Sequence, residues 1–226
     1  MSPSSEVERM EKSRVPYASV VDNLIIAMMR TRPDIAQVVG VVISGLNAQQ
    51  QLLIRDWHDV EYFTEHMLEG LTSLRTLDIH YCKKLKSLSE GVRHLAHLES
   101  LKIIDCPELM DLSSNMRQLT ALQFVSISGY STLPYGFQRV PFLRTLAITN
   151  CRSISLSDWV GDMTTLERLS IRNCEELRSL PSSIQRLINL SYLTIYCCPH
   201  LQERCKRETG EDWQYINHIP QLGLYP

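Results

Sequence analysis

Apolar side chains recur along most of this chain in a fixed order, with polar residues between them. The stretch that begins at Leu71, "LTSLRTLDIHYCKKLKSL", is apolar at its first, fourth, seventh, ninth, twelfth, fifteenth and eighteenth positions. Leu77 and Ile79 are two residues apart, and this spacing places both side chains on one face of a β-strand. The pattern therefore predicts a short strand that buries Leu77 and Ile79 and turns the residues beside them to the other face.

The same order returns in later stretches, whose starts follow one another at intervals of 21 to 24 residues. They are "LAHLESLKIIDCPELMDL" from Leu95, "LTALQFVSISGYSTL" from Leu119, "VPFLRTLAITNCRSISL" from Val140, "MTTLERLSIRNCEELRSL" from Met163 and "LINLSYLTIYCCPHL" from Leu187. A weaker unit fits the same register upstream, with Leu46, Leu52 and Ile54. One unit cannot bury its apolar face alone, whereas stacked units bury theirs against one another.

Each unit follows L-x-x-L-x-x-L-x-I-x-x-C-x-x-L, which resembles the leucine-rich-repeat signature with its period of about 20–29 residues. The sequence therefore predicts an α/β solenoid over residues 46–200. We expect a leucine-rich-repeat horseshoe of about seven repeats, with a short parallel β-ladder on its concave face.

Five cysteines share one place in the unit, eleven residues after its first position, and Tyr130 and Trp57 take that place in the other two units. These cysteines are Cys82, Cys106, Cys151, Cys174 and Cys198. Stacked equivalents rise by about 4.8 Å per repeat, so they form a column and cannot surround one zinc ion at about 2.3 Å. A nucleophile would need a base repeated with it. We therefore interpret these thiols as structural: small, buried and weakly hydrogen-bonding.

The residues between the inward-facing pairs of each strand are the best candidates for a binding surface, because solenoids commonly use this face. They are Gln51, Leu53, Arg55, Thr76, Asp78, His80, Ser100, Lys102, Ile104, Phe124, Ser126, Ser128, Thr145, Ala147, Thr149, Arg168, Ser170, Arg172, Tyr192, Thr194 and Tyr196. The middle of this set is small and neutral, and both ends carry charges and aromatic rings.

Aromatic and arginine side chains carry most of the energy of protein recognition, so this surface favours a protein partner. The candidate partner-binding residues are Arg55, Asp78, His80, Lys102, Phe124, Arg168, Arg172, Tyr192 and Tyr196. Ordinary solvated strand residues are the alternative interpretation. The mixed charge argues against a groove that follows phosphates, and the formal net charge of −2 favours neither a nucleic acid nor an anionic membrane.

No catalytic constellation, phosphate loop or metal-spaced set of cysteines and histidines occurs, so we expect a protein that is not an enzyme and needs no cofactor or metal. His94 and His97 would suit a metal on a helix, but they flank repeat leucines, which favours a surface loop. Seven cysteines without a secretory signal favour a reducing compartment, the cytoplasm or the nucleus. The apolar run over residues 35–54 contains three consecutive glutamines and is a poor membrane span.

The C-terminal stretch "CCPHLQERCKRETGEDWQYINHIP" ends the periodicity. Trp213, Ile216 and Ile219 could cover the open edge of the last repeat, which makes residues 201–226 a terminal cap. The pattern C-P-x-L-x-x-R-C, followed by G-E-D-W and H-I-P, resembles the tail of plant nucleotide-binding leucine-rich-repeat disease-resistance proteins, and the resemblance covers residues 46–226.

This resemblance implies a module of plant innate immunity that senses a pathogen effector, a modified host protein or another receptor domain, and that restrains a nucleotide-driven switch. The sequence contains no G-x-x-x-x-G-K-[ST] phosphate loop. We therefore expect the sensor half without the switch.

The N-terminal segment differs in kind. After a disordered stretch over residues 1–14, the apolar spacing predicts two short helices over residues 15–45. The motifs V-P-Y-A-S and T-R-P-D-I-A in residues 15–42 resemble copia-type retrotransposon polyproteins, without the paired aspartates of the polymerase or the carboxylates of the nuclease. An accidental fusion without a role is the favoured interpretation, and a helical plug for the first repeat is the other. Two readings of the whole chain stay open beside recognition: a degenerate chimeric gene fragment, and an inactive retroelement-derived polymerase or nuclease remnant.

Overall fold

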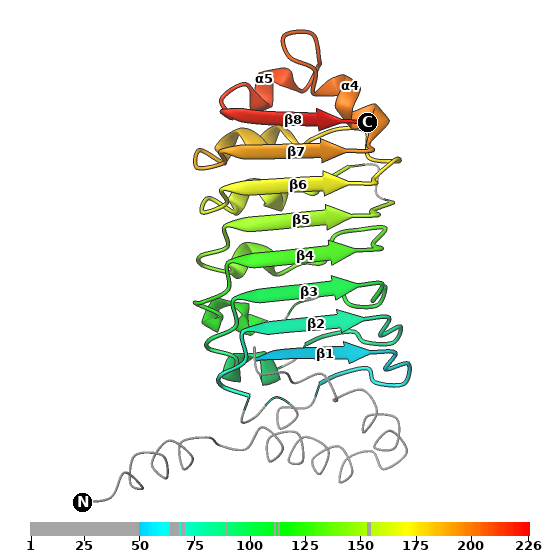
Figure 1. The fold of residues 1–226 in the computed structure, drawn as a ribbon, viewed down its shortest axis with the longest axis vertical. Coiled ribbons are helices and arrows are strands. Elements are labelled where there is room, and N and C mark those ends of the chain that lie inside the picture. Colours follow the sequence, from blue (N-terminus) through cyan, green and yellow to red (C-terminus); the bar gives the residue numbers. More distant parts are fainter. Residues whose placement is uncertain are drawn as a thin grey trace, which may run out of the picture.

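The structure, a computed structural model, describes residues 50–226 except 64–67, 69–70, 89, 111, 113 and 153–154. Eight strands form one sheet in chain order (Figure 1), and every neighbouring pair is parallel. The strands are β1 (Gln51–Arg55), β2 (Thr76–His80), β3 (Ser100–Ile104), β4 (Phe124–Ser128), β5 (Thr145–Thr149), β6 (Arg168–Arg172), β7 (Tyr192–Tyr196) and β8 (Gln221–Tyr225). The predicted leucine-rich-repeat solenoid is confirmed, and its predicted strands are β1–β7.

The repeat sets the register of the sheet without slippage. Leu77 of β2 lies opposite Leu101 of β3, and Ile79 lies opposite Ile103. These four side chains are buried, because the two-residue period turns both members of each pair inward. Equivalent residues therefore stack in continuous apolar columns from one end of the sheet to the other.

A residue with positive φ follows each of the first seven strands. These residues are Asp56, Tyr81, Asp105, Gly129, Asn150, Asn173 and Cys197. Glycine, asparagine and aspartate tolerate this left-handed conformation best. The backbone N–H of each residue donates to the last carbonyl of the next strand, as Asn173 does to Tyr196 at 2.9 Å. This turn directs the next residue, the one at the cysteine position, into the core.

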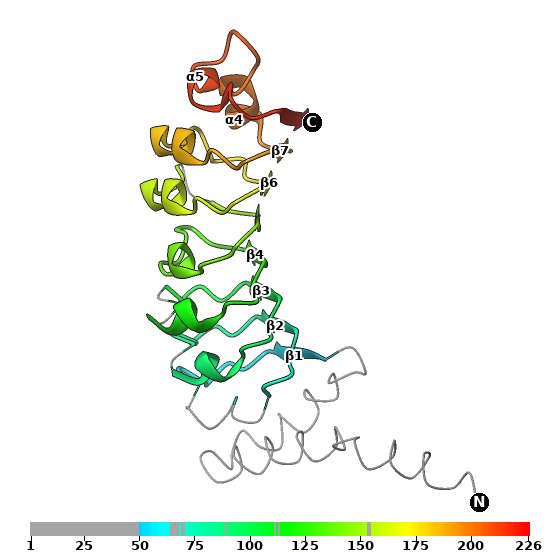
Figure 2. The same cartoon turned by 90° about the vertical axis from the view of Figure 1, so that its left-hand side faces the viewer.

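Short 3₁₀ helices form the outer arc on the side opposite the sheet, and the outer surface of the sheet is gently concave (Figure 2). Each outer-arc helix buries an apolar side chain in the core. In chain order these are Val92, Met116, Phe137, Val160 and Ile184. The helices are η3 (Glu90–His94), η4 (Ser114–Gln118), η5 (Phe137–Arg139), η6 (Asp158–Asp162) and η7 (Ser182–Arg186). Within the described residues, no helix is long and apolar enough to cross a membrane.

The C-terminal end closes the stack with α4 (Pro199–Arg204), α5 (Trp213–Ile216) and the edge strand β8. Ile216 and Ile219 are buried there. The sequence analysis placed only a cap in this stretch and missed β8, in which Leu222 lies opposite Leu193 and Leu224 lies opposite Ile195. The signal was a single L-x-L pair between Pro220 and Pro226.

The predictions for the N-terminus lie outside the described residues. They are the disordered stretch 1–14, the two helices over residues 15–45 and the beginning of the first repeat up to residue 49.

Candidate functional site

Three rows of side chains cross the concave face because the strands are in register. The first row is Gln51, Thr76, Ser100, Phe124, Thr145, Arg168, Tyr192 and Gln221. The middle row is Leu53, Asp78, Lys102, Ser126, Ala147, Ser170, Thr194 and Gly223. The third row is Arg55, His80, Ile104, Ser128, Thr149, Arg172, Tyr196 and Tyr225. All nine predicted partner-binding residues lie in these rows.

A shallow hollow of about 460 Å³ crosses the concave face from β4 to β7. Its middle row is small: Ser126, Ala147, Ser170 and Thr194. Larger side chains surround this floor: Phe124, Arg168, Arg172 and Tyr192. We call this feature the β4–β7 hollow. It forms because short middle-row residues lie between long ones in register on neighbouring strands.

The two arginines of β6 are held by neighbours at the rim of the β4–β7 hollow. The guanidinium carbon of Arg168 lies 4.9 Å from the ring centroid of Tyr192, within the range of a cation–π contact. Arg172 Nε donates to Ser170 Oγ at 3.0 Å. Neither arginine forms an ion pair with a carboxylate in the part of the chain that the structure describes. Both positive charges therefore remain available to a partner.

The other charged group lies at the β1–β3 end of the face. Asp78 is only 6% exposed. Its Oδ2 accepts a hydrogen bond from Gln51 Nε2 at 3.2 Å and lies 3.6 Å from Lys102 Nζ. Asp78 and Lys102 therefore neutralise each other in part. Asp78 is less accessible than the sequence analysis expected.

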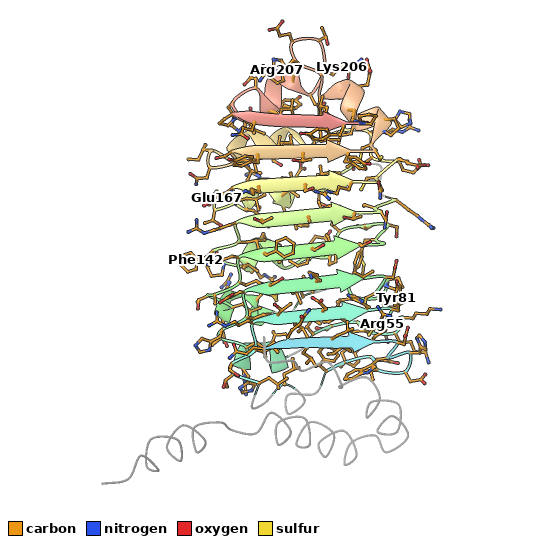
Figure 3. All side chains as sticks on the ribbon, in the orientation of Figure 1. Arg55, Tyr81, Phe142, Glu167, Lys206 and Arg207 are labelled. Atoms are coloured by element: carbon orange, nitrogen blue, oxygen red, sulfur yellow. The ribbon has the colours of Figure 1, made fainter. Side chains whose placement is uncertain are left out.

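Burial lowers the pKa of His80, and the charges of Arg55 and Lys102 add to this effect while Asp78 opposes it. Arg55 also lies over the ring of Tyr81, 5.7 Å from its centroid, at the edge of the sheet labelled in Figure 3. His80 is consequently neutral near pH 7, and Arg55 and Lys102 are the cations of this end.

The nine predicted residues thus divide into two groups. The β4–β7 hollow is lined by Phe124, Arg168, Arg172 and Tyr192. Tyr196 lies opposite Arg172 in the third row. Arg55, Asp78, His80 and Lys102 form the group at the β1–β3 end. Sequence reasoning missed Gln221 and Tyr225, which extend the first and third rows onto β8. The L-x-L pair of β8 could have revealed them.

A second hollow of about 440 Å³ lies at the edge where the strands begin, and Figure 3 labels two of its lining residues, Phe142 and Glu167. Arg144, which also lines it, pairs with Glu167 at 2.5 Å. Its charges are therefore already neutralised, in contrast to those of the β4–β7 hollow.

The five predicted structural cysteines are buried, and none of them forms a disulfide. The backbone N–H of Cys151 donates to Cys174 Sγ and that of Cys174 donates to Cys198 Sγ, both at 3.3 Å. The Cys174 thiol donates to the carbonyl of Arg172, the last residue of β6, at 3.2 Å. Hydrogen bonds to Cys151 and Cys198, together with burial, raise the pKa of Cys174. The raised pKa keeps the Cys174 thiol protonated, as its hydrogen bond to the Arg172 carbonyl requires.

In the described residues, no three histidine, cysteine or acidic side chains are placed so that they could hold a metal ion. His97 Nδ1 instead lies 2.8 Å from the carbonyl of Thr72. Trp213, the other predicted structural residue, packs partly buried against the core, with the Arg207 guanidinium 5.8 Å from its ring centroid.

Comparison with known proteins agrees with this geometry. The chain belongs to the leucine-rich-repeat family: the family model described as "Leucine-rich repeat region" matches residues 49–225. Its relatives include "Probable disease resistance protein RF45" of Arabidopsis thaliana, 31% identical over 184 residues that make up 77% of this chain and 17% of that protein. The repeats thus resemble those of plant disease-resistance proteins, as the C-terminal motifs indicated, and the chain spans under a fifth of that relative.

Two further similarities concern a short stretch of the sequence and the fold. A stretch of 42 residues is 50% identical to the "Retrovirus-related Pol polyprotein from transposon TNT 1-94" of Nicotiana tabacum, covering 19% of this chain and 3% of that one. Among solved structures, Toll in the Drosophila Toll–Spätzle complex superposes with a TM-score of 0.54 at 21% identity, over 77% of this chain and 23% of that chain. At this identity the likeness shows the fold.

Proposed function

We propose that this chain is a non-enzymatic protein-recognition module of plant disease resistance, and that its partner binds the concave face. One observation carries the proposal: the β4–β7 hollow has a floor of small side chains and a rim of two aromatic rings and two arginines, and neither arginine pairs with a carboxylate of the described residues. Aromatic and arginine anchors around a central depression are the usual source of binding energy between proteins.

The small residues of the floor contribute to binding in a different way from the large residues of the rim. Ser126, Ala147, Ser170 and Thr194 allow the backbone of a partner to approach the sheet. The strands beneath are rigid because their inward side chains are buried in continuous columns. A preorganised surface loses little conformational entropy on binding, which leaves more of the contact energy for affinity.

The resemblance to disease-resistance proteins supplies the biological setting. It supports a pathogen effector, a host protein or another immune-receptor domain as the partner, and the cytoplasm or nucleus as the place of binding. Toll, which shares this fold, is in complex with the protein Spätzle. The sensor-only role expected from the missing phosphate loop belongs to the same proposal.

The repeat columns favour this function over a degenerate gene fragment. All inward positions of the eight strands are leucine, isoleucine or valine. A chain that no longer had to fold would tolerate polar side chains there, and each would destabilise the stack because an unpaired buried polar group is costly.

Photo-cross-linking tests the proposal on the full chain. Phe124, on the rim of the β4–β7 hollow, is replaced by p-benzoylphenylalanine, which keeps an aromatic ring there and leaves the floor open. A matched protein carries this residue at Gln185, exposed on the outer arc in η7. Both proteins are irradiated in plant leaf extract, and cross-linked proteins are identified by mass spectrometry. We expect specific partners from position 124 that position 185 does not give. Equal products from both positions, or none from position 124, would contradict the proposal.

A further inference from the structure

Arg168 and Arg172 are the first and last residues of β6, and both side chains point to the concave face. Four residues of parallel strand separate their Cα atoms by about 13 Å. Ser170 lies between them on the floor of the β4–β7 hollow. The two arginine side chains therefore border the hollow at opposite ends of β6.

Nothing on this part of the face neutralises the two charges. The outward positions of β4, β5, β7 and β8 are uncharged, so Arg168 and Arg172 are the charged side chains of the face from β4 to β8. The carboxylate next in sequence, Glu167, lies in the loop before β6 and pairs with Arg144 at 2.5 Å. An acidic partner would meet two cations without displacing an internal carboxylate.

Both guanidinium groups are oriented before a partner arrives. Stacking on Tyr192 restrains Arg168, and Arg172 uses only its Nε in the hydrogen bond to Ser170. The terminal nitrogens of Arg172 remain as donors, and a guanidinium can hold a carboxylate with two parallel hydrogen bonds. Little side-chain entropy is then lost when a carboxylate binds.

We propose that the β4–β7 hollow binds an extended acidic segment of a partner protein, with carboxylates on Arg168 and Arg172. An extended chain advances by about 3.3 Å per residue, so acidic side chains four residues apart match the two arginines. The side chain midway between them would lie over Ser170 and Ala147, beside Phe124. This inference rests on the proposed function and adds the chemistry of the ligand.

A nucleic acid fits this face less well. Phosphate backbones are bound by continuous basic stripes, whereas the rows on both sides of β6 contain hydroxyl, methyl and aromatic side chains. Two isolated cations at a fixed separation favour two discrete anions.

The test uses three fluorescein-labelled peptides with blocked termini and the full chain. The first is Gly-Ser-Asp-Ala-Phe-Ala-Asp-Ser-Gly, the second has asparagine at both aspartates, and the third has its aspartates two residues apart. Fluorescence anisotropy gives their dissociation constants at low salt. We expect the first peptide to bind about tenfold more tightly than the other two, because charge-assisted hydrogen bonds are about twice as strong as neutral ones.

Arg168→Gln and Arg172→Gln should each weaken binding of the first peptide by about tenfold, because each removes one charge-assisted pair. Arg178→Gln is the matched control: Arg178 is exposed in the same repeat but lies after β6 and off its concave face. It changes the net charge equally and should leave binding unchanged. Thermal unfolding midpoints establish that the three variants are folded.

Four results of the binding assays would overturn the inference: equal affinity for the aspartate and asparagine peptides, no detectable binding of the aspartate peptide, equal weakening by Arg178→Gln, or tighter binding of a uridine oligonucleotide. Cross-linking from position 124 separates the inference from the proposed function. If cross-links persist in the double variant Arg168→Gln/Arg172→Gln, the face recognises proteins by other contacts and only this inference fails. If cross-links are also absent from the wild-type background, the proposed function fails with it.

Discussion

The carboxylate of Asp212 accepts a hydrogen bond from the backbone N–H of Leu180, with 2.9 Å between Leu180 N and Asp212 Oδ2. Its other oxygen accepts from Arg204 Nη2 at 2.7 Å and from Arg204 Nε at 3.2 Å. Asp212 is fully buried. The aspartate of the G-E-D-W motif therefore joins the C-terminal cap to the preceding repeat and holds α4 in place.

Asp212→Ala should lower the free energy of unfolding by about 3 kcal/mol, because it leaves the Leu180 N–H and the Arg204 guanidinium without their buried acceptor. Glu211→Ala is the control: Glu211 also pairs with Arg204 but is exposed, so its loss should cost less than about 1 kcal/mol. Urea unfolding of both variants measures the difference. Equal costs would show that Asp212 does not hold the cap.

Gly161 permits close contact between η6 and η7. A Cβ atom at Gly161 would lie 2.3 Å from the backbone oxygen of Ser183, and backbone cannot move aside as a side chain can. Gly161→Ala should therefore destabilise the protein by about 2–3 kcal/mol through overpacking.

Gly223→Ala is the matched control for this substitution. The nearest atoms to its new Cβ belong to the Tyr225 side chain, which is 52% exposed and can rotate away. Thermal unfolding should place the Gly223→Ala midpoint near wild type and the Gly161→Ala midpoint several degrees lower. The reverse order would contradict the close packing of the outer arc.

Cys197 occupies the left-handed turn position after β7, with a φ of 49°. Asparagine tolerates this conformation better than cysteine, because its side chain can hydrogen-bond to the local backbone. Cys197→Asn should raise the free energy of unfolding by up to about 1 kcal/mol, since the left-handed conformation costs an ordinary side chain about 1–2 kcal/mol, whereas Cys197→Val should lower it. Chemical denaturation compares the two, and no gain from asparagine would argue against strain at this turn.

Stability should decrease at high pH because of Cys205. Burial and the charge of Asp212 raise the pKa of this thiol from 9.0 to about 12. Above pH 9 the unfolded chain loses this proton while the folded chain keeps it until about pH 12, so alkali favours unfolding. The loss is at most about 1.4 kcal/mol per pH unit for one thiol. Cys205→Ala and Cys205→Ser should both flatten the decrease in unfolding free energy above pH 9, and an unchanged slope in both would contradict it.

The repeating part of the structure could be predicted from the sequence because each repeat presents the same signal. Leu77 and Ile79 have equivalents in every unit, so stacking, register and the outward rows follow from one pattern. The turn residues Asp105, Asn150 and Asn173 carried a further signal for the left-handed conformation that the sequence analysis did not use.

The features without repetition were harder to predict. β8 shows a single L-x-L pair, and Pro220 and Gly223 obscure it. Asp212 gave no sign of burial, since carboxylates are rarely buried unless they are paired, and its partner Leu180 is 32 residues away. The burial of Asp78 likewise depends on contacts with residues from β1 and β3, which sequence spacing does not specify.

A steric block on the floor of the β4–β7 hollow tests the central claim most directly. Ala147→Trp would fill the floor, and Gln185→Trp would place the same side chain on the outer arc. Each variant and the wild type would be used for affinity enrichment from leaf extract. Quantitative mass spectrometry would measure the proteins that cross-link to the concave face of the wild type. Melting curves would establish that both variants are folded.

If the concave face recognises a protein, Ala147→Trp should reduce those partners by at least about tenfold, a loss of about 1.4 kcal/mol in binding free energy. Gln185→Trp should retain them. Undiminished partners with a folded Ala147→Trp protein, or equal loss from Gln185→Trp, would contradict recognition through this face.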